Sequence, residues 1–301
     1  MVEPLYQELD NIAILEISRF CLCPPHLQMK RFFIISLIIV FGVGGFLWQG
    51  VYLAKDPTLT KEQLFLIEKG ENLFLIAENL EKEGLIKSKC FFELHIFLKG
   101  TQANLQAGKY LLSPAMDVTE IAQKIISGDI AKIIVTIPEG FTVEQIEERL
   151  GLKLPGENLE GFLFPDTYQF PLGVSGKEVV EKMQANFQKK TKDLEITPEI
   201  VTMASLLEKE VETKEEKELA SGVLWKRLEI GMPLQVDAAM ETYERRGLPE
   251  RPICNPGLES ILTALYPKES TYWYYLSASS GETFFSETLE EHNIKKAEHL
   301  K

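Results

Sequence analysis

Cysteine and histidine are scarce in this chain of 301 residues, and their placement excludes several classes of protein. The four cysteines (Cys21, Cys23, Cys90 and Cys254) are too few and too far apart for a disulfide scaffold, although a Cys90–Cys254 bridge stays open. Cys21 and Cys23 have no matching pair later in the chain, which argues against a structural zinc site. The four histidines show no metal-ligand spacing, so no metal or other cofactor is predicted.

Positive charge is also in short supply. Lysine and arginine together number 32 against 45 aspartates and glutamates, which gives a formal net charge of -13. Nucleic-acid binding needs clustered cations to face the phosphates, so nucleic acid is not an expected partner. The same shortage argues against docking on anionic lipid through a broad basic face.

Charge is absent altogether from Phe32 to Ala54, a run of 23 residues. A transmembrane helix needs roughly 20 apolar residues, so this run predicts a membrane anchor. Lys30 and Arg31 precede it and place its N-terminal side in the cytoplasm, and Tyr52 lies near the far end, where amphipathic rings favour the interface. The alternatives are a cleaved signal peptide, for which no small-residue cleavage site closes the run, and a buried core helix.

The segment before the anchor is mixed in character and ends in Pro24-Pro25-His26. Met29-Lys30-Arg31 followed by the apolar run is typical of the start of a membrane anchor. We therefore hypothesise that Met29 is the true initiator. Mass spectrometry of the native N-terminus tests this hypothesis, and a peptide from residues 1–28 would rule it out.

Beyond a short polar linker (residues 55–60), the chain predicts a small α/β module over residues 61–130. Helices are expected at 72–84, 91–98 and 118–126, and strands at 64–67 and 106–111. His95 falls in the second helix, where we expect a hydrogen-bonded core role. A β-branched strand at 133–137 and a short helix at 143–150 follow. The run Glu160–Tyr168 is too apolar for an ordinary loop, and either packed core or the wall of a sugar cleft explains it.

Two carboxylates distinguish the helix predicted from Ile200 to Val211. Thr197 and Pro198 are typical of a helix start. At about 100° per residue, Glu208 and Glu210 fall on opposite edges of an apolar stripe, whereas Thr202 and Lys209 point away from it. A carboxyl group against apolar surface keeps its proton longer, which suits a general acid for glycosidic bonds. The alternative is that both side chains reach solvent.

The C-terminal part predicts a second helix and a hairpin. Thr213 and Glu216 form a capping box for a helix that ends near Gly231. Residues 272–279 and 283–285 are expected to pair around Ser280-Gly281. Asn255 before Pro256 reads as an N-cap for the helix that reaches Tyr266, so a structural role is one interpretation of Asn255.

Six motifs in order give the chain a resemblance to the endolytic murein transglycosylase (MltG, YceG-like) family. The residues that carry it are Glu160–Tyr168 (EGFLFPDTY), Ala204–Glu210 (ASLLEKE), Trp225–Leu228 (WKRL), Gly231–Asp237 (GMPLQVD), Gly247–Gly257 (GLPERPICNPG) and Glu291–Asn293 (EHN). The resemblance covers the chain from about residue 60 to its end. It implies an α+β fold with a single transmembrane helix (32–54) after a cytoplasmic segment (1–31), a LysM-like module (55–131) and a catalytic domain (132–301).

The resemblance assigns the catalytic acid/base to Glu208. This carboxyl would protonate the oxygen between MurNAc and GlcNAc and then take the proton of the C6 hydroxyl of the same MurNAc, closing a 1,6-anhydro ring. Most glycosidases instead need a second carboxylate to attack or to activate water. Further residues are candidates for supporting the site and positioning the sugar: Gln235, Asp237, Tyr243, Asn255 and Glu210.

The sequence departs from the family pattern in two places. Residues 238–246 are all that remains of a longer stretch, with Thr242-Tyr243 an echo of its YNTY element, which predicts a cleft more open on one side. Thr283 stands where relatives often have a histidine, and His292 is the candidate to replace it.

Three functions compete. The first is a plasma-membrane transglycosylase whose extracytoplasmic domain cleaves nascent peptidoglycan strands and ends their elongation, beside cell-wall synthases as further partners. The second is a muramidase in which Asp237 or Glu210 activates water. The third is an inactive wall-binding scaffold. The LysM-like module either binds glycan or serves as a spacer.

Overall fold

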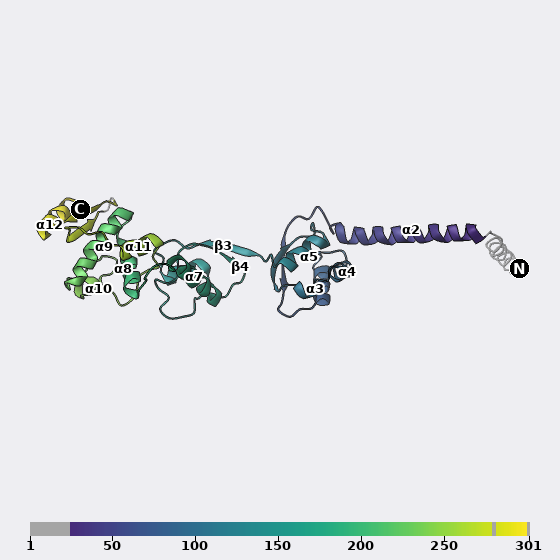
Figure 1. Ribbon diagram of the computed structural model, residues 1–301, viewed down its shortest axis with the longest axis horizontal. Helices are drawn as coiled ribbons and strands as arrows, with labels where there is room; N and C mark the ends of the chain where they lie inside the picture. Colours follow the sequence, from purple (N-terminus) through teal and green to yellow (C-terminus); the bar gives the residue numbers. More distant parts are fainter. Residues whose placement is uncertain (1–24, 279–280, 300–301) are drawn as a thin grey trace, which may run out of the picture. The chain divides into compact units, whose positions relative to one another are not determined.

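The computed structural model describes residues 25–278 and 281–299, and the chain divides into two compact units with the sequence boundary between Ala131 and Lys132. Both units mix helices with short antiparallel strand pairs (Figure 1), which confirms the predicted α+β class. Each unit has its own hydrophobic core. Residues 1–24, which include Cys21, Cys23 and most of the segment 1–28 that precedes the hypothesised initiator Met29, lie outside the described residues.

Helix α2 (Pro25–Tyr52) opens the first unit. Its stretch from Met29 to Tyr52 is long and apolar enough to cross a membrane, and its large side chains are exposed over most of its length. Length and composition fit a membrane anchor and a signal sequence alike. The predicted span of 32–54 falls on this helix apart from its last two residues.

The rest of the first unit follows the order predicted from periodicity. Strands β1 (Gln63–Ile67) and β2 (Gly108–Leu112) pair antiparallel, with helices α3 (Leu73–Lys82), α4 (Lys89–Lys99) and α5 (Val118–Ser127) and a 3-10 turn, η1 (Gln102–Asn104), completing the unit. The side chains of Asn72 and Asp117 cap α3 and α5 by accepting backbone N–H groups. The core role expected for His95 is wrong. His95 is only partly buried, makes no hydrogen bond among the described residues and lines a cavity.

The second unit begins with β3 (Lys132–Thr136), which pairs antiparallel with β4 (Thr167–Pro171). Helices α6 (Val143–Leu150) and α7 (Gly176–Thr191) belong to this part of the unit. The run Glu160–Tyr168, which leads into β4, supplies core, because Leu163, Phe164 and Tyr168 are all at most 4% exposed. The Tyr168 hydroxyl donates to the Phe164 carbonyl, which satisfies the polar end of a buried ring.

Helix α8 (Pro198–Glu210) is the central element of the second unit, packed against α9 (Lys214–Glu229) and α11 (Leu258–Leu265). Thr197 caps it as predicted. Every residue from Val201 to Leu207 is buried, so the expectation that Thr202 points away from the core is wrong. A helix with neighbours on several sides buries more than one stripe.

The chain ends with a short helix, α10 (Glu241–Glu244), before α11, and with a hairpin and a helix after it. The hairpin pairs β5 (Tyr274–Ser277) with β6 (Thr283–Ser286), and α12 (Leu289–His299) packs on both strands. Ser280 of the predicted turn lies outside the described residues. Cys90 and Cys254 belong to different units and are both free thiols.

Candidate active site

Helix α8 sends its two glutamates to different parts of the second unit. Residues two positions apart on a helix point about 200° apart. The Glu208 carboxylate accepts from the backbone N–H of Gly257 at 2.9 Å, whereas the Glu210 carboxylate accepts from that of Ala238, also at 2.9 Å. The two carboxylates named by the sequence therefore serve two separate polar sites.

Glu208 is held almost completely out of water. Its side chain is 9% exposed, and its Oε1 lies 3.6 Å from Nζ of Lys217, whose side chain is 5% exposed. Lys217 is in the first part of α9, and the Thr213–Glu216 capping box fixes the start of that helix. A buried carboxylate needs such a partner, because an unpaired charge in a dry site is strongly disfavoured.

Two further carboxylates surround this pair. Glu259 Oε1 also lies 3.6 Å from Lys217 Nζ, with its side chain 45% exposed. Glu139 lies against Gly257, where an added Cβ would sit 1.9 Å from Glu139 Oε1. Burial, followed by repulsion from Glu208, raises the pKa of Glu139 above its ordinary value. We call Glu139, Glu208, Glu259 and Lys217 the carboxyl cluster; it contains three acids and one ammonium group.

Backbone pairing brings Glu139 to Glu208. The Gly140 N–H donates to the Asn255 carbonyl, and the Asn255 N–H donates to the Phe141 carbonyl, each at 2.9 Å. The turn after β3 therefore lies beside the segment that leads into α11. Gly257 has no side chain, so both carboxylates can approach its backbone.

Asn255 is a structural residue in this arrangement, but its predicted N-cap role is wrong. The N-cap position of α11 is Gly257. The Asn255 Oδ1 accepts from the Leu163 N–H at 2.9 Å, and its Nδ2 donates to the Phe141 carbonyl and to Glu160 Oε1, each at 3.0 Å. The side chain thus joins three segments that are distant in the sequence.

The other predicted support residues gather around Glu210 instead. Gln235, Asp237 and Tyr243 line a cavity of about 280 Å³ together with Glu210. The Tyr243 hydroxyl donates to Asp237 Oδ1 in a short hydrogen bond, and burial, together with this bond, raises the pKa of Tyr243 to about 12. Burial also raises the pKa of Glu210. None of these residues contacts Glu208 in the structure.

The wall of the Glu210 cavity is built on a buried arginine. Arg227 of α9 donates from Nε to the Trp273 carbonyl at 2.8 Å and from Nη1 to the Leu234 carbonyl at 2.6 Å. His292 lines the same cavity and stacks on Tyr274 with ring centroids 5.4 Å apart. The Tyr275 hydroxyl, another lining group, has no hydrogen-bond partner among the described residues.

Sequence reasoning missed Lys217, Glu139 and Glu259. Lys217 occupies an ordinary surface-like position in a helical first turn, and only its burial reveals its role. Glu139 follows a strand in the turn Pro138-Glu139-Gly140, where a charged residue is unremarkable. Within residues 25–278 and 281–299, no group of three or more histidine, cysteine, aspartate and glutamate side chains could hold a metal ion.

Comparisons with known proteins agree with the family predicted from the motifs. The YceG-like family matches residues 65–241 and 239–298, which is more than half of the sequence. The chain, an α+β protein with a carboxyl cluster around the buried Lys217, therefore belongs to the YceG-like family.

Curated relatives carry a functional name. The endolytic murein transglycosylase of Bacillus subtilis (strain 168) is 29% identical over 302 residues, covering 78% of this chain and 84% of that protein. The endolytic murein transglycosylase of Streptococcus pneumoniae serotype 2 (strain D39) is 24% identical over 357 residues, covering 89% of this chain but only 64% of the pneumococcal protein. A crystal structure of a yceG-like protein from Listeria monocytogenes is 27% identical, with a TM-score of 0.48, and the match covers 78% of this chain and 99% of that one.

Proposed function

We propose that this chain is an endolytic peptidoglycan lytic transglycosylase. It cleaves the MurNAc–GlcNAc bond of nascent glycan strands without water, leaves 1,6-anhydro-MurNAc ends and so terminates strand elongation. Helix α2 anchors it in the plasma membrane, with residues 132–301 on the extracytoplasmic side near the cell-wall synthases. Family membership and the names of the relatives support the reaction class.

The observation that carries the proposal is the environment of Glu208. Its carboxyl is 9% exposed, fixed by the Gly257 N–H and faced by Lys217. A general acid/base needs a fixed position and a second stable protonation state. Lys217 faces the Glu208 carboxyl at 3.6 Å, and neighbouring Glu139 has a raised pKa because of burial and the Glu208 charge.

The reaction then needs one carboxyl group in two steps. Protonated Glu208 gives its proton to the bridging oxygen, the bond from that oxygen to C1 of MurNAc breaks, and the GlcNAc-bearing strand leaves as an alcohol. The Glu208 carboxylate next takes the proton of the C6 hydroxyl while the C6 oxygen bonds to C1 and closes the 1,6-anhydro ring. The acid is regenerated and no water is consumed.

A second candidate function is hydrolysis of the same bond at the Glu210 cavity. Glu210 has a raised pKa beside Asp237, in a cavity whose lining also includes Tyr275, with a buried hydroxyl that has no hydrogen-bond partner among the described residues. A carboxylic acid and a nearby carboxylate are what hydrolytic glycosidases use. Because Glu208 contacts other segments, this muramidase would rest on Glu210 and Asp237 alone.

Digestion of purified glycan strands by wild type, Glu208→Gln and Glu210→Gln separates these functions. The transglycosylase predicts products lighter by one water, lost in Glu208→Gln and retained in Glu210→Gln. Products heavier than the anhydro products by one water, lost in Glu210→Gln and retained in Glu208→Gln, would establish the muramidase. Cleavage by none of the proteins, with binding retained, would establish a wall-binding scaffold.

A further inference from the structure

The last turn of α2 is built into the first unit. Gly50 lies under the ring of Phe91, where an added Cβ would sit 2.3 Å from Phe91 Cε1. Val51 is 8% exposed, and the rings of Phe46 and Phe91 are 5.4 Å apart. The apolar helix is therefore joined to α4 by packing as well as by the chain.

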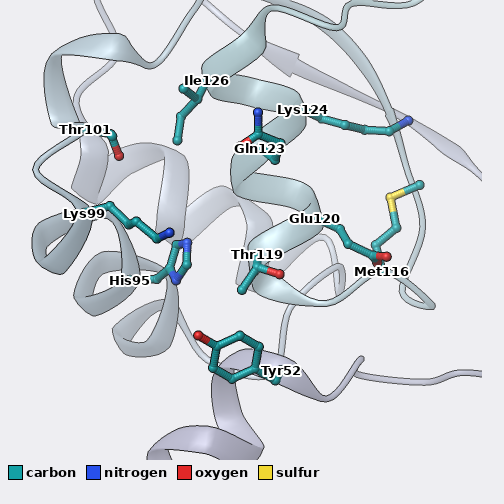
Figure 2. Close-up of a pocket in the computed structure, with 10 residues that line it drawn as sticks. All are labelled: Tyr52, His95, Lys99, Thr101, Met116, Thr119, Glu120, Gln123, Lys124 and Ile126. Carbon is teal, nitrogen blue, oxygen red and sulfur yellow. The ribbon is translucent and has the colours of Figure 1, made fainter.

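A cavity of about 740 Å³ opens beside this junction (Figure 2). Tyr52, the last residue of α2, contributes one wall, α4 contributes His95 and Lys99, and α5 contributes Thr119 and Gln123. In Figure 2 the Lys99 ammonium group lies beside the His95 ring, and the Tyr52 hydroxyl is turned toward His95. Side chains that can donate hydrogen bonds thus gather in one hollow.

Two lysines line this cavity, and Lys99 is the exposed one. It makes no ion pair or hydrogen bond with any of the described residues, and it lies one helical turn from His95. Burial, and after it the Lys99 charge, lowers the pKa of His95. The carboxylate in the lining, Glu120, accepts from the Asp117 N–H as part of the α5 capping box.

The second lysine in the lining, Lys124, has a hydrogen-bond partner, whereas the hydroxyl of Thr101 has none among the described residues. Lys124 donates to the Leu111 carbonyl at 3.1 Å and points away from Lys99 in Figure 2. The Thr101 hydroxyl oxygen is buried without a hydrogen-bond partner among the described residues. A site with a free ammonium group and spare hydroxyls favours an anionic ligand with several oxygens.

The position of the cavity relative to a membrane limits the class of ligand that it can bind. The uncharged run ends at Ala54, and rings such as Tyr52 prefer the level of the lipid headgroups. If α2 spans the bilayer, the cavity beside Tyr52 opens at that level. The acidic composition of the whole chain argues against a broad basic face, but a single open pocket needs no such face.

We propose that this cavity binds the phosphate of a membrane-lipid headgroup, with Lys99 as the counter-ion and His95, Tyr52 and Gln123 as hydrogen-bonding partners. The ligand class is a phosphate ester, for which a lipid and a soluble phosphate are the two sources. The proposal shares with the proposed function only the membrane-spanning role of α2, and it does not depend on glycan cleavage.

The test uses the full chain in nanodiscs of phosphatidylcholine with or without phosphatidylglycerol, and native mass spectrometry counts the lipids that stay bound. Wild type is expected to retain phosphatidylglycerol, and Lys99→Gln is expected to retain about fivefold less. Lys82→Gln removes the same charge from an exposed position on α3 and should behave like wild type. Unchanged thermal unfolding of Lys99→Gln shows that the fold is intact.

Three outcomes would overturn the proposal. Equal retention by wild type and Lys99→Gln removes the assigned counter-ion. Binding of inorganic phosphate with no preference for phosphatidylglycerol identifies a soluble phosphate as the ligand. Displacement of the lipid by an uncharged chitooligosaccharide identifies a glycan site.

The His95 imidazole resonances give a second readout, because they should shift when phosphatidylglycerol enters the nanodisc. Glu208→Gln should retain lipid normally, which separates failure here from failure of the proposed reaction.

Discussion

Glu139 and Glu208 lie on the backbone of the same glycine, so the charge of one acts on the proton of the other. Burial and the charge of Glu208 raise the pKa of Glu139. Glu208→Gln removes that charge, so we expect the pKa of Glu139, measured by NMR titration of its side-chain carboxyl carbon, to fall towards its ordinary value.

Glu259→Gln is the matched control, because Glu259 faces the same lysine but is 45% exposed and better screened. It should shift the pKa of Glu139 less. The pKa of Glu139 is higher in the folded state than in the unfolded chain. Ionisation of Glu139 therefore lowers the free energy of unfolding above the folded-state pKa, and this loss disappears as pH falls through that pKa. Glu139→Gln should consequently be no less stable than wild type at pH 7. An unchanged pKa of Glu139 in a folded Glu208→Gln protein would refute the coupling.

A substitution at Gly257 tests the contact between this glycine and the Glu139 carboxyl. Gly257→Ala places a methyl group where Glu139 Oε1 now lies, 1.9 Å from the new carbon. Because Glu139 is exposed and flexible, its carboxyl can move aside, and we expect a loss below about 1 kcal/mol of unfolding free energy in urea denaturation. Adding Glu139→Ala should restore most of that stability. No recovery in the double variant would show that Glu139 is not the obstructing group.

At the scale of elements, one arginine joins α9 to the hairpin. Arg227 is 3% exposed, and its two hydrogen bonds reach the carbonyls of Trp273 and Leu234. Arg227→Met leaves those buried carbonyls without donors, and we expect a loss of roughly 3 kcal/mol in urea denaturation. Arg245→Met changes an exposed arginine and should have almost no effect. Equal stability of the two variants would contradict the bracing role.

Local signals predicted the elements well because they depend on neighbouring residues. Thr197 caps α8, and Thr213 and Glu216 form the capping box of α9, as the sequence indicated. The N-cap prediction for Asn255 was wrong because its side-chain oxygen accepts from the backbone N–H of Leu163, 92 positions away, and not from the adjacent helix. The burial of Thr202 likewise depends on α9 and α11, which periodicity within α8 does not show.

The candidate site was predicted only in part, for the same reason. The motifs gave Glu208 and Glu210, but helix geometry alone did not show which support residues belong to which carboxylate. The structure brings Gln235, Asp237 and Tyr243 to Glu210. It brings Lys217 and Glu139 to Glu208 through contacts between segments that are distant in the sequence.

At the scale of the whole molecule, thiol labelling at Cys90 reports on the side of the membrane that the chain after α2 faces. Cys90 in the first unit is exposed, whereas Cys254 in the second is buried. Burial raises the pKa of the Cys254 thiol to about 12, so it stays protonated and unreactive near pH 8. A variant with Cys21, Cys23 and Cys254 changed to serine leaves Cys90 as the only thiol in the chain.

In intact cells, a membrane-impermeant maleimide should label Cys90 in this variant if the chain after α2 faces the outside. A matched variant that keeps Cys21 as its only cysteine should be labelled only after the cells are permeabilised, because Lys30 and Arg31 favour a cytoplasmic N-terminus. The reverse pattern would show that α2 has the opposite orientation, and peptidoglycan would then be out of reach of Glu208. Should Met29 be the initiator, the Cys21 variant will carry no label under any condition, and the Cys90 result alone decides the orientation.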